Sequence, residues 1–207
     1  RQAVLGALDG QVAGFNALAD DESRTRGLLQ VLTHERSRRS WRQCHDRMEE
    51  LKARGQGARP LLLVLPGIMG SELSLKSGDA DHPVWLSLQA MLLGQLRRLR
   101  VTQVLEPTGV LSVAYERLLA AAEDQFHVFS LPFDWRQSID ALGQDAARCL
   151  TELLDAAAKL EPPQPVHVLA HSMGGLVARL ALDPGGDGAE LWRRFADADG
   201  RLLMLGT

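Results

Sequence analysis

From residue 60 onward, short continuous apolar runs alternate with longer stretches whose apolar side chains recur every three or four residues. The short runs predict strands at 61–65, 127–131, 166–170 and 201–207. The longer stretches predict helices at 115–123, 139–160, 176–182 and 191–197. Strands that alternate with helices at this spacing predict parallel strands joined by right-handed crossovers. The expected fold class is therefore α/β, with a doubly wound, mostly parallel sheet flanked by helices.

The N-terminal part of the chain, residues 1–58, has a different pattern. It is rich in polar residues, and its scattered apolar residues have helical spacing, which predicts a helical extension that stops at the turn-forming GQGA. The remainder, 59–207, is predicted to be the α/β core. Within that core, 72–100 reads as a cap-like or lid-like insertion. It contains an expected loop at 77–83, followed by one amphipathic or largely buried helix at 84–100.

Composition narrows the possible functions only slightly. A chain of 207 residues that is 45% hydrophobic can bury the core of one domain. A net charge of −3 gives no general reason to expect a nucleic-acid partner. Cys44 and Cys149 lack metal-ligand spacing, so they are two thiols or one disulfide. We expect no metal and no cofactor.

The two ends of the sequence indicate a piece of a longer protein. The chain opens without methionine and stops at LMLGT, in what reads as a strand-to-loop junction. It contains no run of about 20 apolar residues and no signal-peptide pattern. These features favour the cytoplasm but leave the location of the parent protein open. The oligomeric state is open as well.

The stretch AHSMGGL, from position 170, has the composition of a nucleophile elbow. In such an elbow a strand turns sharply into a helix and presents a serine, here Ser172, above the sheet edge. The positions two before and two after the serine must be small, and they are Ala170 and Gly174, while Gly175 allows the helix to pack closely. The backbone N–H of Met173 would face the developing oxyanion. The alternative is a serine that merely caps the following helix.

The second half of an oxyanion hole should follow an earlier strand. PGIMGSEL, at 66–73, directly follows the first predicted strand. Gly67 helps to turn the chain, and the N–H of Ile68 is the candidate donor, with that of Met69 as second choice. Gly70 would let this loop lie close to the elbow.

Four motifs in order carry a resemblance to a known family: PGIMGSEL (66–73), LPFDWR (131–136), AHSMGGLVAR (170–179) and LMLGT (203–207). Over about residues 60–207, the chain resembles the lecithin:cholesterol acyltransferase-like branch of the α/β-hydrolases. That branch includes lysosomal-type phospholipases and bacterial lipase and esterase homologues. The resemblance implies a partial α/β-hydrolase fold and a serine acyl hydrolase or acyltransferase that acts on ester lipids.

The resemblance also assigns roles to individual positions. It implies that Ser172 is the nucleophile, that Met173 and Ile68 form the oxyanion hole, and that residues 133–136 are a wall near the acyl pocket. The cysteines that clip a lid loop in secreted animal members are absent from 72–100.

The catalytic Asp and His should follow the serine after two further strands, which places them beyond Thr207. His171 is interpreted as a packing residue, and His127 and His167 as core or strand-edge histidines. Residues 1–207 alone are therefore expected to be inactive, because a serine without its base retains little acceleration.

The leading hypothesis is an ester hydrolase or acyltransferase that works through an acyl-enzyme on Ser172. A non-catalytic hydrolase-like binding module is the alternative from another class, and a peptidase or thioesterase on the same fold stays open. Acyl and acceptor specificity are not indicated. The segment 84–100 is either a buried cap or a lid that contacts a membrane or micelle, with Arg97, Arg98 and Arg100 at its end.

Overall fold

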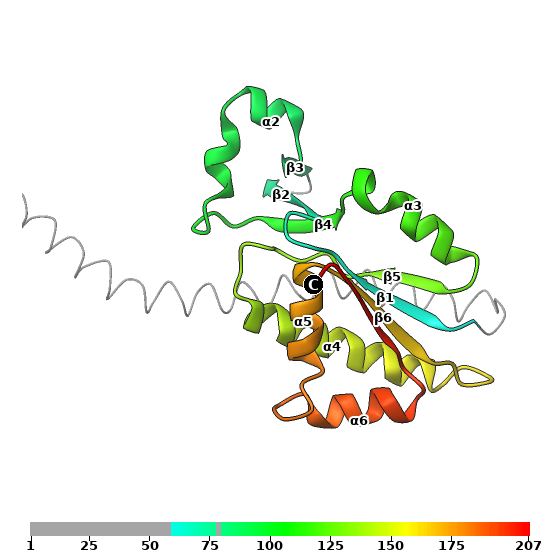
Figure 1. The fold of residues 1–207 in the computed structure, drawn as a ribbon. Coiled ribbons are helices and arrows are strands. Elements are labelled where there is room, and N and C mark those ends of the chain that lie inside the picture. The colour runs from blue at the N-terminus through cyan, green and yellow to red at the C-terminus, as the bar shows by residue number, and fades with distance from the viewer. Residues whose placement is uncertain (1–58, 78–79) are drawn as a thin grey trace, which may run out of the picture. The chain divides into compact units, whose positions relative to one another are not determined.

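The computed structural model describes residues 59–77 and 80–207, which belong to one compact unit (Figure 1). The predicted helical extension over 1–58, which includes Cys44, lies outside the described residues. Within the described part of the chain, no helix is both long enough and apolar enough to cross a bilayer.

The core is a parallel sheet with the strand order β5-β1-β6-β7. Its strands are β1 (Leu61–Leu65), β5 (His127–Ser130), β6 (Val166–His171) and β7 (Leu202–Leu205). The helices that flank it are α3 (Ser112–Glu123), α4 (Ile139–Ala157), α5 (Met173–Ala181) and α6 (Ala189–Asp197). The predicted doubly wound α/β sheet is thereby confirmed.

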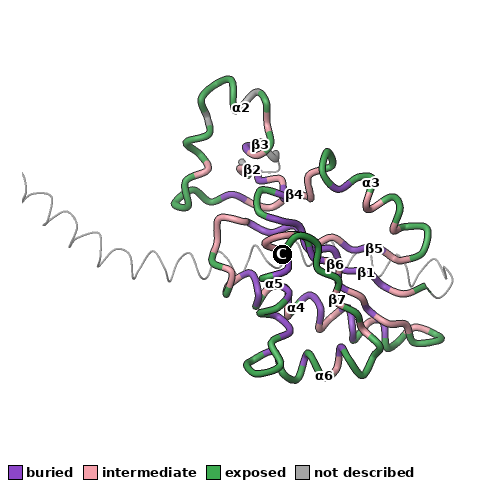
Figure 2. The backbone as a smooth tube through the Cα atoms, in the orientation of Figure 1, coloured by how far each residue is buried: buried purple, intermediate pink, exposed green. Residues whose placement is uncertain are grey.

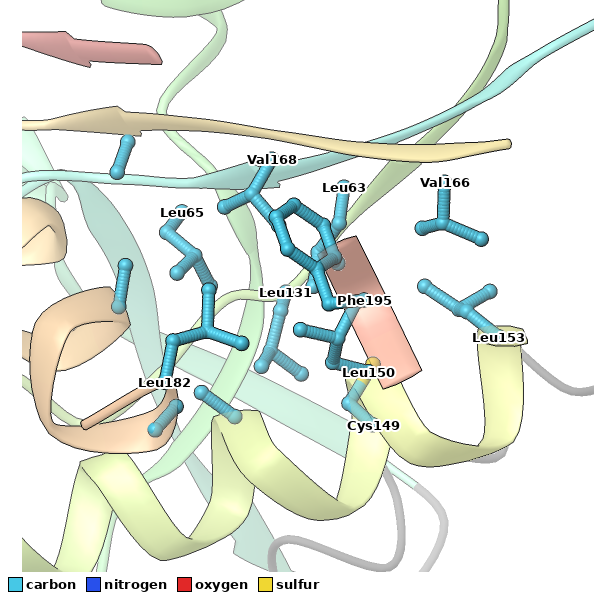
Figure 3. Close-up of a cluster of buried hydrophobic side chains, with 14 of the residues drawn as sticks. Leu63, Leu65, Leu131, Cys149, Leu150, Leu153, Val166, Val168, Leu182 and Phe195 are labelled. Atoms are coloured by element: carbon cyan, nitrogen blue, oxygen red, sulfur yellow. The ribbon is translucent and has the colours of Figure 1, made fainter. Parts of the chain in front are cut away.

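Strand β1 lies in the middle of this sheet and is buried on both faces, as a continuous apolar run predicts. Leu61, Leu63 and Leu65 belong to a large buried cluster with apolar residues of α4, α5 and α6, and Figure 3 shows Leu63 and Leu65 within it. Leu62 and Val64 point to the other face, where they pack near residues of α3. Because the helices occupy both faces, β1 is shielded from water on both sides, whereas the edge strand β7 is mostly exposed.

The register between the two central strands, β1 and β6, determines where the segments that directly follow these strands lie. Leu65, the last residue of β1, pairs with Ala170 near the end of β6. Both strands run in the same direction, so the loop after β1 and the turn after β6 leave the sheet at the same edge.

A second, antiparallel sheet with the order β3-β2-β4 corrects the sequence prediction for the region after β1. Its strands are β2 (Ser71–Ser77), β3 (Ala80–Trp85) and β4 (Glu106–Val110). A loop was expected at 77–83, because Ser, Gly, Asp and Pro are typical of turns. The strands form nevertheless, since Leu73 and Val84 join Leu105 in a small buried core.

The segment 84–100 is not the single helix that the sequence predicts. Trp85 ends β3, a short helix α2 spans Leu88–Leu92, and a 3-10 turn η1 spans Gln95–Leu99. Gly94 separates the last two with a φ of 66°, which interrupts the helical hydrogen bonding. The buried alternative is also wrong, because Leu88 and Leu92 are 71% and 78% exposed (Figure 2).

The loop after β5 joins the two sheets. The backbone N–H of Phe133 donates to Oγ of buried Ser71 at the start of β2, at 3.0 Å. The Asp134 carboxylate and the Arg136 guanidinium form a buried pair at 2.6 Å, with side chains 3% and 4% exposed. Arg136 also donates to the carbonyl oxygens of Arg100 and Gln103, at 2.9 and 3.2 Å.

We expect Arg136→Ala to lower the free energy of unfolding by about 3–5 kcal/mol, because it leaves the Asp134 carboxylate buried without its partner. Urea denaturation followed by circular dichroism measures this loss. Arg193→Ala is the matched control, because the ion pairs of Arg193 are exposed and its loss should hardly move the midpoint. Equal midpoints for the two variants would contradict a structural role for the buried pair.

Candidate active site

Ser172 is the single residue between β6 and α5, and its backbone is strained. Its φ of 50° and ψ of −120° are unusual for a non-glycine residue and cost on the order of 1–3 kcal/mol. A serine that caps a helix normally has an extended backbone and accepts a hydrogen bond from the first turn. The backbone of Ser172 is not extended, because its φ is positive, and its side chain makes no capping hydrogen bond. The helix-cap interpretation is therefore wrong.

The small residues around Ser172 are required by close contacts. A Cβ atom on Gly174 would lie 2.6 Å from the carbonyl oxygens of Leu65 and Pro66. A Cβ atom on Gly175 would collide with the side chain of Thr207. Ala170 is fully buried. The sharp turn is possible only because Gly174 leaves room for the end of β1 and Gly175 leaves room for Thr207.

The loop after β1 lies directly against this turn. Gly70 N–H donates to the carbonyl oxygen of Gly67 at 3.0 Å, which closes a tight turn over residues 67–70. A Cβ atom on Gly67 would approach the Ser172 Cβ to 3.2 Å. Met69, at the third position of the turn, has a φ of 58°. The structure thus brings together the two motifs that the sequence singled out.

Among the described residues, the backbone N–H groups of Ile68, in the turn whose Gly67 contacts Ser172, and of Met173, which follows Ser172, have no hydrogen-bond acceptor. Met173 is the first residue of α5, so its N–H belongs to the positive end of the helix dipole. The Ile68 side chain is exposed. A hydroxyl beside such donors can attack a carbonyl carbon whose oxygen becomes negatively charged.

Two aromatic side chains hold the 67–70 turn, and the sequence analysis missed both. Gly67 N–H donates to Tyr115 Oη at 2.8 Å, and Trp85 Nε1 donates to the Met69 carbonyl at 2.9 Å. Tyr115 Oη is also 2.8 Å from Nδ1 of His171. His171 is exposed and hydrogen-bonded rather than simply packed. The chain contains one tyrosine, but no local pattern indicates where that side chain ends up.

The described residues offer Ser172 no histidine–carboxylate pair, since its side chain has no hydrogen-bond partner among them. His167 lies within β6, and burial, assisted by the positive charge of Arg201, lowers the pKa of its ring below the usual value. Its Nδ1 is buried without a partner in the described part of the chain. His127 lies at the start of β5.

A groove of about 690 Å³ lies elsewhere on the molecule, between α4, the end of α5 and α6. Its lining includes Asp140, Arg148, Asp183 and Arg194, but none of the residues around Ser172. An attack by Ser172 on a carbonyl carbon would therefore take place outside this groove.

Comparison with known proteins adds one finding. Residues 119–192 match the family model of lecithin:cholesterol acyltransferase, a segment that runs from α3 to α6 and includes Ser172 and Met173. No curated protein matches the chain. The similarity supports a lipid acyltransferase or esterase type of function in general.

Gly174→Ala should lower the free energy of unfolding by about 1–3 kcal/mol, because the added methyl group overlaps two carbonyl oxygens. Gly109→Ala is the matched control, since a Cβ atom there meets only Glu72 Oε2 at an ordinary 3.6 Å. Urea unfolding of both variants is the measurement. Equal stabilities would show that the turn does not need glycine at position 174.

Proposed function

We propose that this protein is a serine acyl hydrolase or acyltransferase of the lipase or phospholipase type, and that Ser172 forms an acyl-enzyme with an ester lipid. The observation that supports it most strongly is the strained backbone of Ser172, next to a loop with a free amide. Strain of this kind persists where a side chain has to be presented for function. The similarity to the acyltransferase family supplies the lipid ester as substrate class.

In the proposed reaction, Ser172 Oγ attacks the ester carbonyl carbon while a base takes the hydroxyl proton. The carbonyl electrons move to its oxygen, which accepts hydrogen bonds from the N–H groups of Ile68 and Met173. Collapse of this intermediate expels the alcohol, which regains a proton, and leaves the acyl group on Oγ. Water or an acceptor alcohol then attacks the acyl-enzyme and restores the serine. Which acceptor arrives decides between hydrolysis and transfer.

We further propose that the base and its carboxylate come from a part of the protein beyond Thr207. The proposal assigns the chain to the α/β-hydrolase superfamily, with 59–207 as part of its core, 72–100 as an insertion and 1–58 as an extension. The parallel neighbours β1 and β6, each followed by one half of the site, support this assignment. Residues 1–207 alone are expected to have little activity.

The insertion offers a surface that suits a lipid aggregate. Between β3 and β4 most of the chain is exposed (Figure 2), and its exposed residues include large apolar ones and three arginines. They are Leu86, Leu88, Met91, Leu92, Leu93, Leu96, Val101 and Val104, with Arg97, Arg98 and Arg100. No acidic residue occurs between 86 and 104. Apolar side chains beside cationic groups are typical of segments that lie in a membrane interface.

We expect a fluorophosphonate to add once to the full-length natural protein, because an activated Ser172 attacks its phosphorus atom. Intact-mass analysis detects the adduct. Ser172→Ala should abolish it, whereas Ser138→Ala, which alters a serine that caps α4, should leave it unchanged. A folded wild-type protein without an adduct would instead favour the non-catalytic binding module.

The double variant Leu88→Gln/Leu92→Gln should lose activity on vesicles of long-chain esters by about tenfold or more, since two large apolar groups no longer enter the lipid. Hydrolysis of a monomeric short-chain ester should change less than about twofold, because the segment then contacts no lipid aggregate. Trp192→Gln on α6 is the control for a general loss of surface hydrophobicity. If both substrates respond equally, the segment does not act at the lipid surface.

A further inference from the structure

Three separate parts of the chain meet at the hydroxyl group of Tyr115. The side chain comes from α3 and is only 4% exposed. Its Oη accepts the Gly67 N–H from the loop after β1 and contacts Nδ1 of His171 at the end of β6, both at 2.8 Å. The Tyr115 and His171 rings meet edge to face, with centroids 5.9 Å apart.

The 67–70 turn is shaped around this hydroxyl. A Cβ atom on Gly70 would lie 2.8 Å from Tyr115 Oη and equally close to the carbonyl oxygen of Gly67. The backbone N–H of Leu111, one turn of chain before Tyr115, donates to the Gly70 carbonyl at 2.9 Å. The start of α3 and the turn are therefore docked on each other through backbone as well as side-chain contacts.

The turn needs external support because it is strained. Met69 occupies a position where φ is positive, which favours glycine. Trp85 holds the Met69 carbonyl, and Tyr115 holds the Gly67 amide. Ile68 lies between these two attachment points, so contacts on either side of it hold the segment that bears its unbonded N–H.

We infer that Tyr115 is a positioning residue of the active site proposed above, and the inference rests on that proposal. Its hydroxyl fixes the 67–70 turn to His171, the residue beside the nucleophile, and thereby keeps the Ile68 amide directed at the developing oxyanion. Tyr115 touches neither the substrate nor the reacting atoms. It acts through the two backbone segments that it joins.

The hydrogen bonds at Oη are compatible with either tautomer of His171. Gly67 N–H occupies one acceptor site of the hydroxyl oxygen. The second bond uses either the hydroxyl hydrogen, with Nδ1 as acceptor, or a hydrogen on Nδ1, with Oη as acceptor. With either tautomer, Tyr115 Oη bonds both Gly67 and His171, and no proton has to be transferred for the two hydrogen bonds to form.

A purely structural role makes a different prediction. A buried tyrosine also needs a partner for its hydroxyl simply to avoid a desolvation cost. In that case, loss of the hydroxyl lowers stability but leaves turnover alone. A positioning role instead lowers kcat and leaves KM nearly unchanged, because the oxyanion exists only beyond the ground state.

The test is Tyr115→Phe in the full-length natural protein, assayed with a soluble short-chain ester. We expect kcat to fall about 10–100-fold, less than the loss of an entire oxyanion donor, with KM within about twofold. Ser74→Ala is the matched control, since it removes another buried hydroxyl and its contact with Thr108 but is not part of the site. Circular dichroism checks that both variants are folded.

A second pair of variants keeps the test decisive if Tyr115→Phe does not fold. His171→Asn places an amide near the position of Nδ1 and can retain the contact with Oη, whereas His171→Gln places its amide near the position of Nε2. We expect His171→Asn to retain clearly more of kcat than His171→Gln.

The outcomes separate the two proposals. If the wild-type protein shows no Ser172-dependent turnover or adduct, the proposed function fails and the inference falls with it. If wild type is active and the Tyr115→Phe kcat equals that of Ser74→Ala, the positioning inference alone is wrong. Equal kcat values for the two His171 variants would also overturn it.

Discussion

The parallel pairing of β1 with β6 is the constraint on which the rest of the molecule depends. It sets Leu65 opposite Ala170, so that two motifs far apart in sequence leave the sheet side by side. The two segments are in close contact, since the Gly174 backbone lies against the carbonyl oxygens of Leu65 and Pro66. A shift in this register would move the 67–70 turn away from Ser172 and remove the proposed site altogether.

The energetics of the site follow from this arrangement. Both Ser172 and Met69 have a positive φ, and each such residue is unfavourable by itself. The folded state tolerates them because the neighbouring contacts are numerous and specific. Small residues let the strands and α5 approach closely, while Tyr115 and Trp85 hold the turn. In the proposed site, strain held in this way would preorganise the oxyanion donors before any substrate is bound.

The segment between β3 and β4 is attached to the 67–70 turn through Trp85, the last residue of β3. Trp85 donates to the Met69 carbonyl and also packs edge to face on Trp135, with ring centroids 5.7 Å apart. Trp135 in turn belongs to the loop that contains the buried Asp134–Arg136 pair. The segment with the exposed apolar residues is therefore attached to the core through a few specific contacts, close to the loop that bears Ile68.

The sequence by itself determined the α/β class, the strands of the parallel sheet and the sharp strand-to-helix turn at Ser172. These depend on local features: the period of apolar residues, and small residues on either side of a serine. The antiparallel sheet, the break of 84–100 at Gly94 and the contacts of Tyr115 were decided by tertiary structure. Tyr115 lies 48 residues from Gly67 and 56 from His171 in sequence. Only the packing of α3 on one face of the sheet brings these groups together, because hydrogen bonds and close contacts between distant segments leave no periodic pattern in the local sequence.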